Sequence, residues 1–232
     1  MKIVTWNCNL RLKDKFEYLA AQSPDIAIVQ ECESLPESFF PGARYLWAGV
    51  DPKKGLGVID FTGSAHVDQS YDASLAFFLP VNLDGGSQKL LASWAFNHRA
   101  ATRFGPEYAG QPHKAFNNYQ EWMEEGDLIV AGDFNNSVVW DKPKGKNNFS
   151  AIAGALSDYG LMSAYHSYTT TKFGEESHAT LYHTKKYDKP YHIDYIFIKD
   201  TESIKDLSVG DYDEWIKLSD HVPVMVEVDK TA

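Results

Sequence analysis

The stretch IKLSDHVPVMVEV, residues 216–228, places two ionisable side chains directly before a strand-like apolar run. The run extends from Val222 to Val228 and has the β-branched composition of a buried strand. Asp220 and His221 come immediately before it, and burying either charge without a partner would be strongly unfavourable. The stretch therefore predicts that other polar groups or a cation hold these two side chains at the point where the strand begins.

Apolar runs of similar length recur along the rest of the chain, with turn residues between them. They are rich in β-branched and aromatic side chains, which favours strands over helices. The predicted strands cover residues 2–6, 25–30, 55–61, 74–81, 89–96, 127–134, 192–198 and 222–228. Three other segments carry apolar residues at helical spacing and are predicted as helices, namely 13–22, 113–125 and 147–160.

The order of these elements favours an α/β sandwich. Strands follow one another directly in the middle of the chain, where residues 56–81 are expected to form a hairpin, so a repeated strand–helix–strand fold is excluded. We expect two mixed β-sheets packed face to face and flanked by helices. No segment rich in Pro and Gly divides the sequence, and residues 1–232 are therefore predicted to form a single domain.

The composition sets limits on the function. Hydrophobic residues make up 44% of the chain, which is enough for a substantial core and excludes a disordered protein. The formal net charge is -10. Because an acidic protein does not hold polyanions by its overall charge, a substrate that carries phosphate would need a local positive charge, such as a divalent metal ion.

The cysteines and the N-terminus indicate the compartment. Cys8 and Cys32 do not form a C-x-x-C pair, which argues against a structural zinc site, and we expect both to be reduced, buried thiols. The N-terminal residues lack the apolar core of a signal peptide, and no run approaches the roughly 20 apolar residues of a membrane span. We therefore expect a cytoplasmic protein with no membrane anchor and no evident obligate protein partner.

Polar side chains stand at or near the ends of five of the predicted strands. They are Asn7, Asn9, Glu31, Asp133, Asn135, Asp194, Asp220 and His221. Each one alone has an ordinary explanation as a turn residue, a solvated acid or a satisfied core histidine. If the strand ends meet at one rim, however, the carboxylates would repel one another unless a cation lay among them. Oxygen ligands without a thiolate suit Mg²⁺ or Mn²⁺ rather than zinc, and a histidine beside them can assist acid–base chemistry.

Five short motifs occur in the order found in a known family. They are Trp6-Asn7-Cys8-Asn9, Gln30-Glu31, Gly132-Asp133-Phe134-Asn135, His192-Ile193-Asp194-Tyr195 and Ser219-Asp220-His221. Through these motifs the chain resembles the endonuclease/exonuclease/phosphatase superfamily, which includes apurinic endonucleases, pancreatic-type deoxyribonucleases, neutral sphingomyelinases and inositol phosphate phosphatases. The resemblance spans residues 3–228. It implies a four-layer α/β sandwich with the site at one edge of two packed sheets.

The resemblance also implies a metal site. Glu31 is similar to the principal metal ligand of the family. Asn7, Asn9 and Asp220 are similar to its partners in the shell around the metal and the phosphate. The implied cofactor is Mg²⁺ or Mn²⁺.

The catalytic residues follow from the same resemblance. Asp133 and Asn135 match the pair that orients the attacking water or stabilises the leaving group. Asp194 and His221 match a pair in which the carboxylate fixes the imidazole and the imidazole faces the scissile phosphate. The implied reaction is hydrolysis of a phosphoester.

One position departs from the family pattern. Many family nucleases have a His or Tyr near the phosphate where Trp94 stands, and an indole cannot act as an acid or a base. Trp94 is therefore either an altered substrate-binding residue or a packed core aromatic. Asn97 resembles a phosphate-contacting Asn, and His98 and Arg99 are candidates to supply the missing group because they are close in the sequence.

Three functions are compatible with these motifs. The first is a metal-dependent phosphodiesterase or nuclease, for which Arg99 and Arg103, and three lysines within 141–148, would provide phosphate contacts. The second is a phosphoesterase for a small molecule or lipid head group, which the acidic charge and the aromatic content favour. The third is a non-catalytic relative that only binds a ligand, which Trp94 favours and the retained acidic residues disfavour. We expect a phosphoester substrate, with nucleic acid as the first choice.

Overall fold

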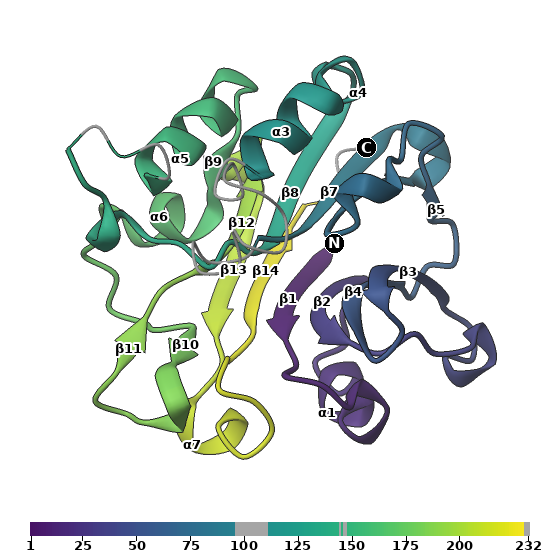
Figure 1. Ribbon diagram of the computed structural model, residues 1–232, viewed down its shortest axis with the longest axis horizontal. Helices are drawn as coiled ribbons and strands as arrows, with labels where there is room; N and C mark the ends of the chain where they lie inside the picture. The colour runs from purple at the N-terminus through teal and green to yellow at the C-terminus, as the bar shows by residue number, and fades with distance from the viewer. Residues whose placement is uncertain (96–110, 144, 146–147, 230–232) are drawn as a thin grey trace.

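The computed structural model describes residues 1–95, 111–143, 145 and 148–229, and within these ranges it contains two six-stranded sheets (Figure 1). The first sheet has the strand order β13-β14-β1-β2-β4-β3. Its strands are β1 (Lys2–Asn7), β2 (Ile26–Cys32), β3 (Arg44–Asp51), β4 (Lys54–Asp60), β13 (Ile204–Val209) and β14 (Val224–Val228). Strands β1 and β2 are parallel and the other pairs of this sheet are antiparallel, so the sheet is mixed.

The second sheet has the strand order β5-β6-β7-β8-β12-β9. Its strands are β5 (His66–Val67), β6 (Phe78–Leu83), β7 (Gln88–Trp94), β8 (Asp127–Asp133), β9 (Met162–Ser163) and β12 (Asp194–Ile198). Here β7 and β8 are the parallel pair. A separate two-stranded sheet joins β10 (Leu181–Tyr182) to β11 (Pro190–Tyr191), shortly before β12 begins (Figure 1).

The helices lie against the outer faces of the two sheets. Side chains from α3 (Gln111–Asn118), α4 (Gln120–Glu124), α5 (Phe149–Asp158) and α6 (Ala164–Thr169) belong to the core cluster that contains the second sheet. Side chains from α1 (Phe16–Ala20) and α7 (Tyr212–Trp215) belong to a second cluster with the outward residues of the first sheet. The short turns of 3-10 helix are η1 (Leu12–Asp14), η2 (Glu37–Phe39), η3 (Ala73–Leu75), η4 (Asp84–Gly86), η7 (Val138–Trp140), η8 (His183–Lys185) and η9 (Thr201–Ser203). This arrangement confirms the predicted four-layer α/β sandwich.

Alternation along the strands decides which polar groups face the gap between the sheets. On β1, Ile3 belongs to the cluster shared with the second sheet, whereas Val4 and Trp6 belong to the outer cluster. Because successive side chains of a strand point to opposite faces, Thr5 and Asn7 face the same gap as Ile3. The first sheet therefore delivers an amide from the end of β1 towards the second sheet.

The predicted hairpin over residues 56–81 is wrong. Strand β4 pairs with β3 and β2 in the first sheet, and β6 pairs with β5 and β7 in the second. The hairpin partner of β4 is β3, an edge strand of the first sheet in which only Tyr45 and Ala48 are buried. The predicted strand 74–81 is also too long, because residues 73–75 form η3 and β6 begins at Phe78.

The helices are shorter than the periodicity predicts. The predicted helix 13–22 is reduced to α1 after η1, and the predicted helix 113–125 is divided into α3 and α4 at Tyr119. Among the described residues, no helix is long and apolar enough to cross a membrane. Cys8 and Cys32 are free and buried, as expected.

Candidate active site

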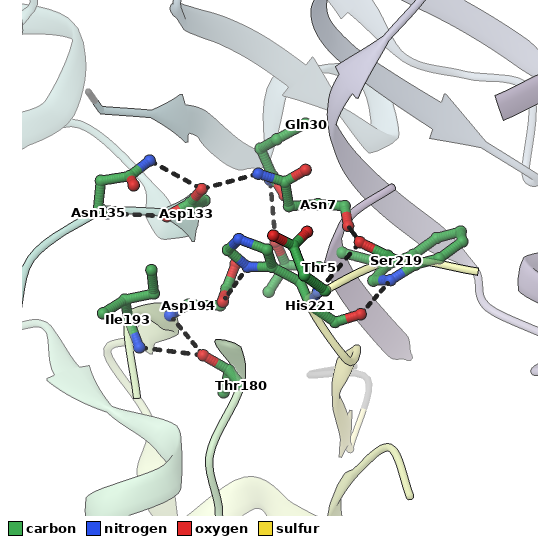
Figure 2. Close-up of polar contacts among 12 residues, drawn as sticks. Thr5, Asn7, Gln30, Asp133, Asn135, Thr180, Ile193, Asp194, Ser219 and His221 are labelled. Atoms are coloured by element: carbon green, nitrogen blue, oxygen red, sulfur yellow. Dashed lines mark hydrogen bonds and ion pairs between the residues drawn. The ribbon is translucent and has the colours of Figure 1, made fainter. Parts of the chain in front are cut away.

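Three strand ends bring the central acidic residues together. Asp133 is the last residue of β8, Asp194 is the first of β12, and the two are direct partners in the antiparallel ladder. Asn7 ends β1 on the facing sheet, and its Nδ2 donates to Asp133 Oδ2 at 3.0 Å. The site therefore bridges the two sheets at the edge where β1 and β8 end (Figure 2).

Gly132 allows Asp133 to reach this position. A Cβ atom built at Gly132 would lie 1.7 Å from the carbonyl oxygen of Ser93 on the neighbouring strand β7. A contact that short is impossible, so any other residue would force β7 and β8 apart. The motif Gly-Asp-Phe-Asn therefore requires glycine at position 132 because the backbones of β7 and β8 approach each other closely beside the site.

Asp133 is a fully buried carboxylate that accepts several hydrogen bonds. Its Oδ1 accepts from the Asn135 backbone N–H at 2.8 Å, and its Oδ2 accepts from Asn135 Nδ2 at 2.9 Å as well as from Asn7. Burial, followed by the charge of Asp194, raises the pKa of Asp133 to about 8 despite these donors. An acid with a pKa near neutral pH is suited to accept a proton from water during catalysis.

Asp194 and His221 form the predicted pair. His221 Nδ1 lies 2.9 Å from Asp194 Oδ2, and both side chains are buried. Burial alone would lower the pKa of His221, but the charge and hydrogen bond of Asp194, with the charges of Asp133 and Asp220, outweigh burial and raise it to about 10. His221 is therefore an imidazolium at neutral pH, and its Nε2–H is the donor that faces away from Asp194.

The backbone around this pair is fixed by neutral side chains. Thr180 Oγ1 accepts from the backbone N–H groups of Ile193 and Asp194 at 3.0 and 3.1 Å. Ser219 Oγ donates to the Asn7 carbonyl at 2.7 Å and accepts from the His221 backbone N–H at 3.0 Å. These bonds attach Asp194 to the segment just before β10 and His221, through Ser219, to the end of β1 (Figure 2).

Asn9 and Asp220 lie together beside this centre. Asn9 Nδ2 donates to Asp220 Oδ1 at 2.9 Å, and the Asn9 backbone N–H donates to Asn7 Oδ1 at 3.0 Å. Asn9 adopts a left-handed backbone conformation with φ of 49°, which asparagine tolerates better than most residues. The predicted residues Asn7, Asn9 and Asp220 are thus joined in one chain of hydrogen bonds.

Glu31 occupies a bulge in β2. The register shifts between Gln30 and Cys32, and Glu31 has a positive φ of 59°. Its carboxylate is paired with the Lys54 ammonium of β4 at 2.9 Å, and that ammonium lies 5.4 Å from the centroid of the Trp94 ring on the other sheet. Glu31 therefore faces the gap between the sheets, at the same edge as Asn7, which is the strand neighbour of Gln30.

Trp94 is buried at the end of β7, where it is the strand partner of Asp133 and packs edge-on against Phe77 at 5.0 Å. This placement fits a packed core aromatic, which was one of the two interpretations of the residue. Asn97, His98, Arg99 and Arg103 lie outside the described residues, as do two of the three lysines of 141–148. The third of those lysines, Lys142, is exposed.

Sequence reasoning missed three polar residues of this region, namely Lys54, Thr180 and Ser219. Thr180 lies in a segment without a predicted element. Nothing in the sequence around a single threonine indicates that its hydroxyl accepts from two backbone N–H groups thirteen and fourteen residues away. Ser219 belongs to the Ser-Asp-His motif, so its position beside Asp220 could have identified it as a residue of this region. Lys54 lies at the start of β4, where a lysine is ordinarily read as a solvated turn residue.

Solved structures with the same fold exist, whereas no family model and no curated protein matches the chain. A 3'-5' exonuclease (NExo) from Neisseria meningitidis superposes with a TM-score of 0.72 at 21% identity, covering 99% of this chain and 100% of that one. A 3' phosphatase NExo from Neisseria bound to a product DNA hairpin gives 0.73 at 20% identity with the same coverage. An AP endonuclease from Archaeoglobus fulgidus gives 0.78 at 16% identity, again over 99% of this chain and 100% of that one. The chain therefore has the fold of these exonuclease and AP endonuclease structures, and its resemblance to the endonuclease/exonuclease/phosphatase superfamily is confirmed at the level of the fold.

Proposed function

We propose that this protein is a divalent-metal-dependent phosphoric ester hydrolase that cleaves phosphodiester bonds of nucleic acid. The observation that carries the proposal is the buried group of Asp133, Asp194 and His221, whose candidate ligand atoms all lie within 4.8 Å of one another. Burying two carboxylates side by side is costly, and a cluster of ionisable groups with raised pKa values at a strand edge is typical of catalytic sites.

The residues present fit a divalent metal ion. We assign Glu31, Asn7, Asn9 and Asp220 as its ligands, because they offer only oxygen donors, which Mg²⁺ and Mn²⁺ prefer. The histidine of the compact group is itself a cation paired with Asp194, so it compensates the acid pair and is not a metal ligand. A further sign is that Asp194 Oδ1 is buried with no hydrogen-bond partner among the described residues, which marks a place for an added positive or donor group.

The bound metal would neutralise charge on the phosphoryl oxygens and help the leaving oxygen. The remaining chemistry falls to the protein. Asp133 accepts the proton of the attacking water, and the amides of Asn7 and Asn135 hold its carboxylate in place. The His221 imidazolium donates from Nε2 to a non-bridging phosphate oxygen, and Asp194 keeps it protonated and oriented.

The choice of nucleic acid rests on the relatives with the same fold, which are named as an exonuclease, a 3' phosphatase bound to DNA and an AP endonuclease. The overall charge of -10 requires that the phosphates be compensated locally, by the metal and by cations of the site. We further propose that residues 1–232 form one domain, because the core cluster includes side chains of both sheets. The free thiols agree with a cytoplasmic location.

The proposal is tested by hydrolysis assays with Mg²⁺ and Mn²⁺ on a panel of phosphoesters. The panel contains duplex DNA with a labelled 3' end, duplex DNA with an abasic site, single-stranded DNA, RNA, a bis-aryl phosphodiester and an inositol phosphate. Wild-type protein should cleave at least one nucleic acid, and activity should disappear in EDTA. Hydrolysis of the inositol phosphate alone would instead support the small-molecule function.

Matched variants separate catalysis from general damage. Glu31→Gln should weaken metal activation and turnover together, whereas Glu227→Gln, an exposed acid on β14, should leave both unchanged. Asp133→Asn should abolish turnover, whereas Asp206→Asn on the exposed face of β13 should not. If Glu31→Gln and Asp133→Asn hydrolyse the substrate as fast as wild type, the protein is not an enzyme of this mechanism.

A further inference from the structure

Lys54 is the positively charged side chain that the motifs did not include. It is the first residue of β4, and its ammonium is 2.9 Å from Glu31 Oε2. Its side chain remains 41% exposed, so it is accessible to solvent and is not enclosed in the core. Of its three N–H groups, the carboxylate of Glu31 engages one, which leaves donors for another anion.

The Lys54 ammonium also lies over the ring of Trp94. The lysine Nζ is 5.4 Å from the centroid of the Trp94 ring, within the range in which the negative face of an indole attracts a cation. Trp94 and Asp133 are direct partners on the parallel strands β7 and β8, so their side chains project from the same face of the sheet. Parallel strands are about 4.8 Å apart, and the ring that supports Lys54 is therefore adjacent to the carboxylate proposed as the base.

We propose that Lys54 is a catalytic residue of this site, which binds a non-bridging oxygen of the substrate phosphate and is held in position by Glu31 and Trp94. This inference rests on the proposed function and deepens it. The indole of Trp94 cannot donate a proton to phosphate chemistry as a His or Tyr would, but it can hold a cation that does bind phosphate. Together with the His221 imidazolium, the Lys54 ammonium would give the site a second positive charge for the phosphate, which is the local compensation that an acidic protein needs.

A structural role for Lys54 predicts different behaviour. If the ammonium only neutralises Glu31, replacing it would free the carboxylate, so the affinity for Mg²⁺ would rise and the affinity for phosphate would not fall. If Lys54 binds the substrate, its loss weakens phosphate binding without weakening metal binding. The two affinities therefore separate the two roles.

The test measures both affinities by calorimetry and, in parallel, kcat and KM on the nucleic acid that wild type cleaves. Inorganic phosphate is titrated into protein saturated with Mg²⁺, and Mg²⁺ is titrated into metal-free protein. The variants are Lys54→Met, which keeps the length of the side chain, and Lys54→Arg, which restores the charge. Lys53→Met is the matched control, because the neighbouring lysine is exposed and belongs to no ion pair among the described residues.

We expect Lys54→Met to lower phosphate affinity and kcat/KM by roughly tenfold or more, the usual effect of losing a hydrogen bond to a charged group. Lys54→Arg should recover most of this loss, Lys53→Met should match wild type, and Mg²⁺ affinity should not fall in any of the three. Phosphate affinity within twofold of wild type in Lys54→Met would overturn the proposal. If wild type cleaves none of the substrates, the proposed function fails, but the phosphate titrations still decide the role of Lys54.

Discussion

Replacing Asp194 by asparagine should remove the charge from His221 while leaving the fold intact. The carboxylate is fully buried, and its Oδ2 is 2.9 Å from His221 Nδ1. Asparagine has the same shape, and its amide oxygen can still accept the imidazole N–H. The positive charge of the ring, however, loses the main contribution that raises its pKa, so the lowering effect of burial then dominates.

The size of the effect follows from the burial of the pair. Breaking a buried ion pair by removing one partner costs about 3–5 kcal/mol, and about 1.4 kcal/mol corresponds to tenfold in rate. If that stabilisation is used in the transition state, kcat should fall by roughly 10²–10⁴-fold. The pKa of His221 should move from about 10 to below its ordinary value of 6.5.

The assay combines kinetics with NMR titration of the imidazole protons. His221 is assigned by the resonances that disappear in His221→Gln, and wild type and Asp194→Asn are then titrated from pH 5 to pH 10.5 without metal. Asp206→Asn serves as the control for an acid lost from an exposed strand. An imidazolium that persists above pH 8 in Asp194→Asn, with kcat within threefold of wild type, would refute the reasoning.

Three further predictions concern stability. The metal-free protein should lose stability as pH rises from about 5 to 9, by several kcal/mol in urea unfolding. The sign follows because folding raises the pKa of Asp133 from 3.8 to about 8 and that of His221 from 6.5 to about 10, so the folded state binds more protons across this window. Asp133→Asn should make the fall shallower, and an unchanged slope would contradict the assignment. Gly132→Ala should destabilise the protein by several kcal/mol or prevent folding, because its Cβ would overlap the Ser93 carbonyl; a normal thermal midpoint would show that the strands can separate freely. Thr180→Val should cost about 2–4 kcal/mol, because two buried N–H groups lose their acceptor, and a loss below 0.5 kcal/mol would mean that water replaces the hydroxyl.

The sequence predicted which polar residues lie together at one edge better than it predicted the connections between strands. Asp133 and Asp194 could be recognised because each is a charge at the end of an apolar run, and such a charge requires a partner wherever the strand lies. Which sheet a strand joins is decided by packing between distant segments, and short runs carry no signal for it. The two strands of the expected hairpin, β4 and β6, therefore lie in different sheets, although both were correctly predicted as strands.

Lys54 shows the same limit within the site. A lysine beside a turn is usually solvated, and nothing near it in the sequence distinguishes it from Lys53. Its role arises only when β4 lies next to the bulge of β2 and opposite β7, which brings Glu31 and Trp94 to the same ammonium. Trp94 departs from the family pattern, in which a His or Tyr stands near the phosphate. In the structure the Lys54 ammonium lies over the ring of Trp94, so a cation occurs beside the position where the family has that polar side chain.

Backbone strain marks the same edge of the molecule independently of charge. Asn9, Glu31 and Asn135 all have φ values between 48° and 59°, a region that costs residues other than glycine about 1–3 kcal/mol where it is held at a functional site. Asparagine reduces that cost with its short polar side chain, but glutamate does not. Glycine would relieve the strain at position 31 and would lose the carboxylate. The bulge holds Glu31 in the strained conformation because its carbonyl accepts from the Leu10 N–H at 3.0 Å while Cys32 returns to the outer face. Without the bulge, the carboxylate of Glu31 would point to that outer face, which is apolar. The strained backbone conformation is therefore what allows the side chain of Glu31 to face the gap between the sheets.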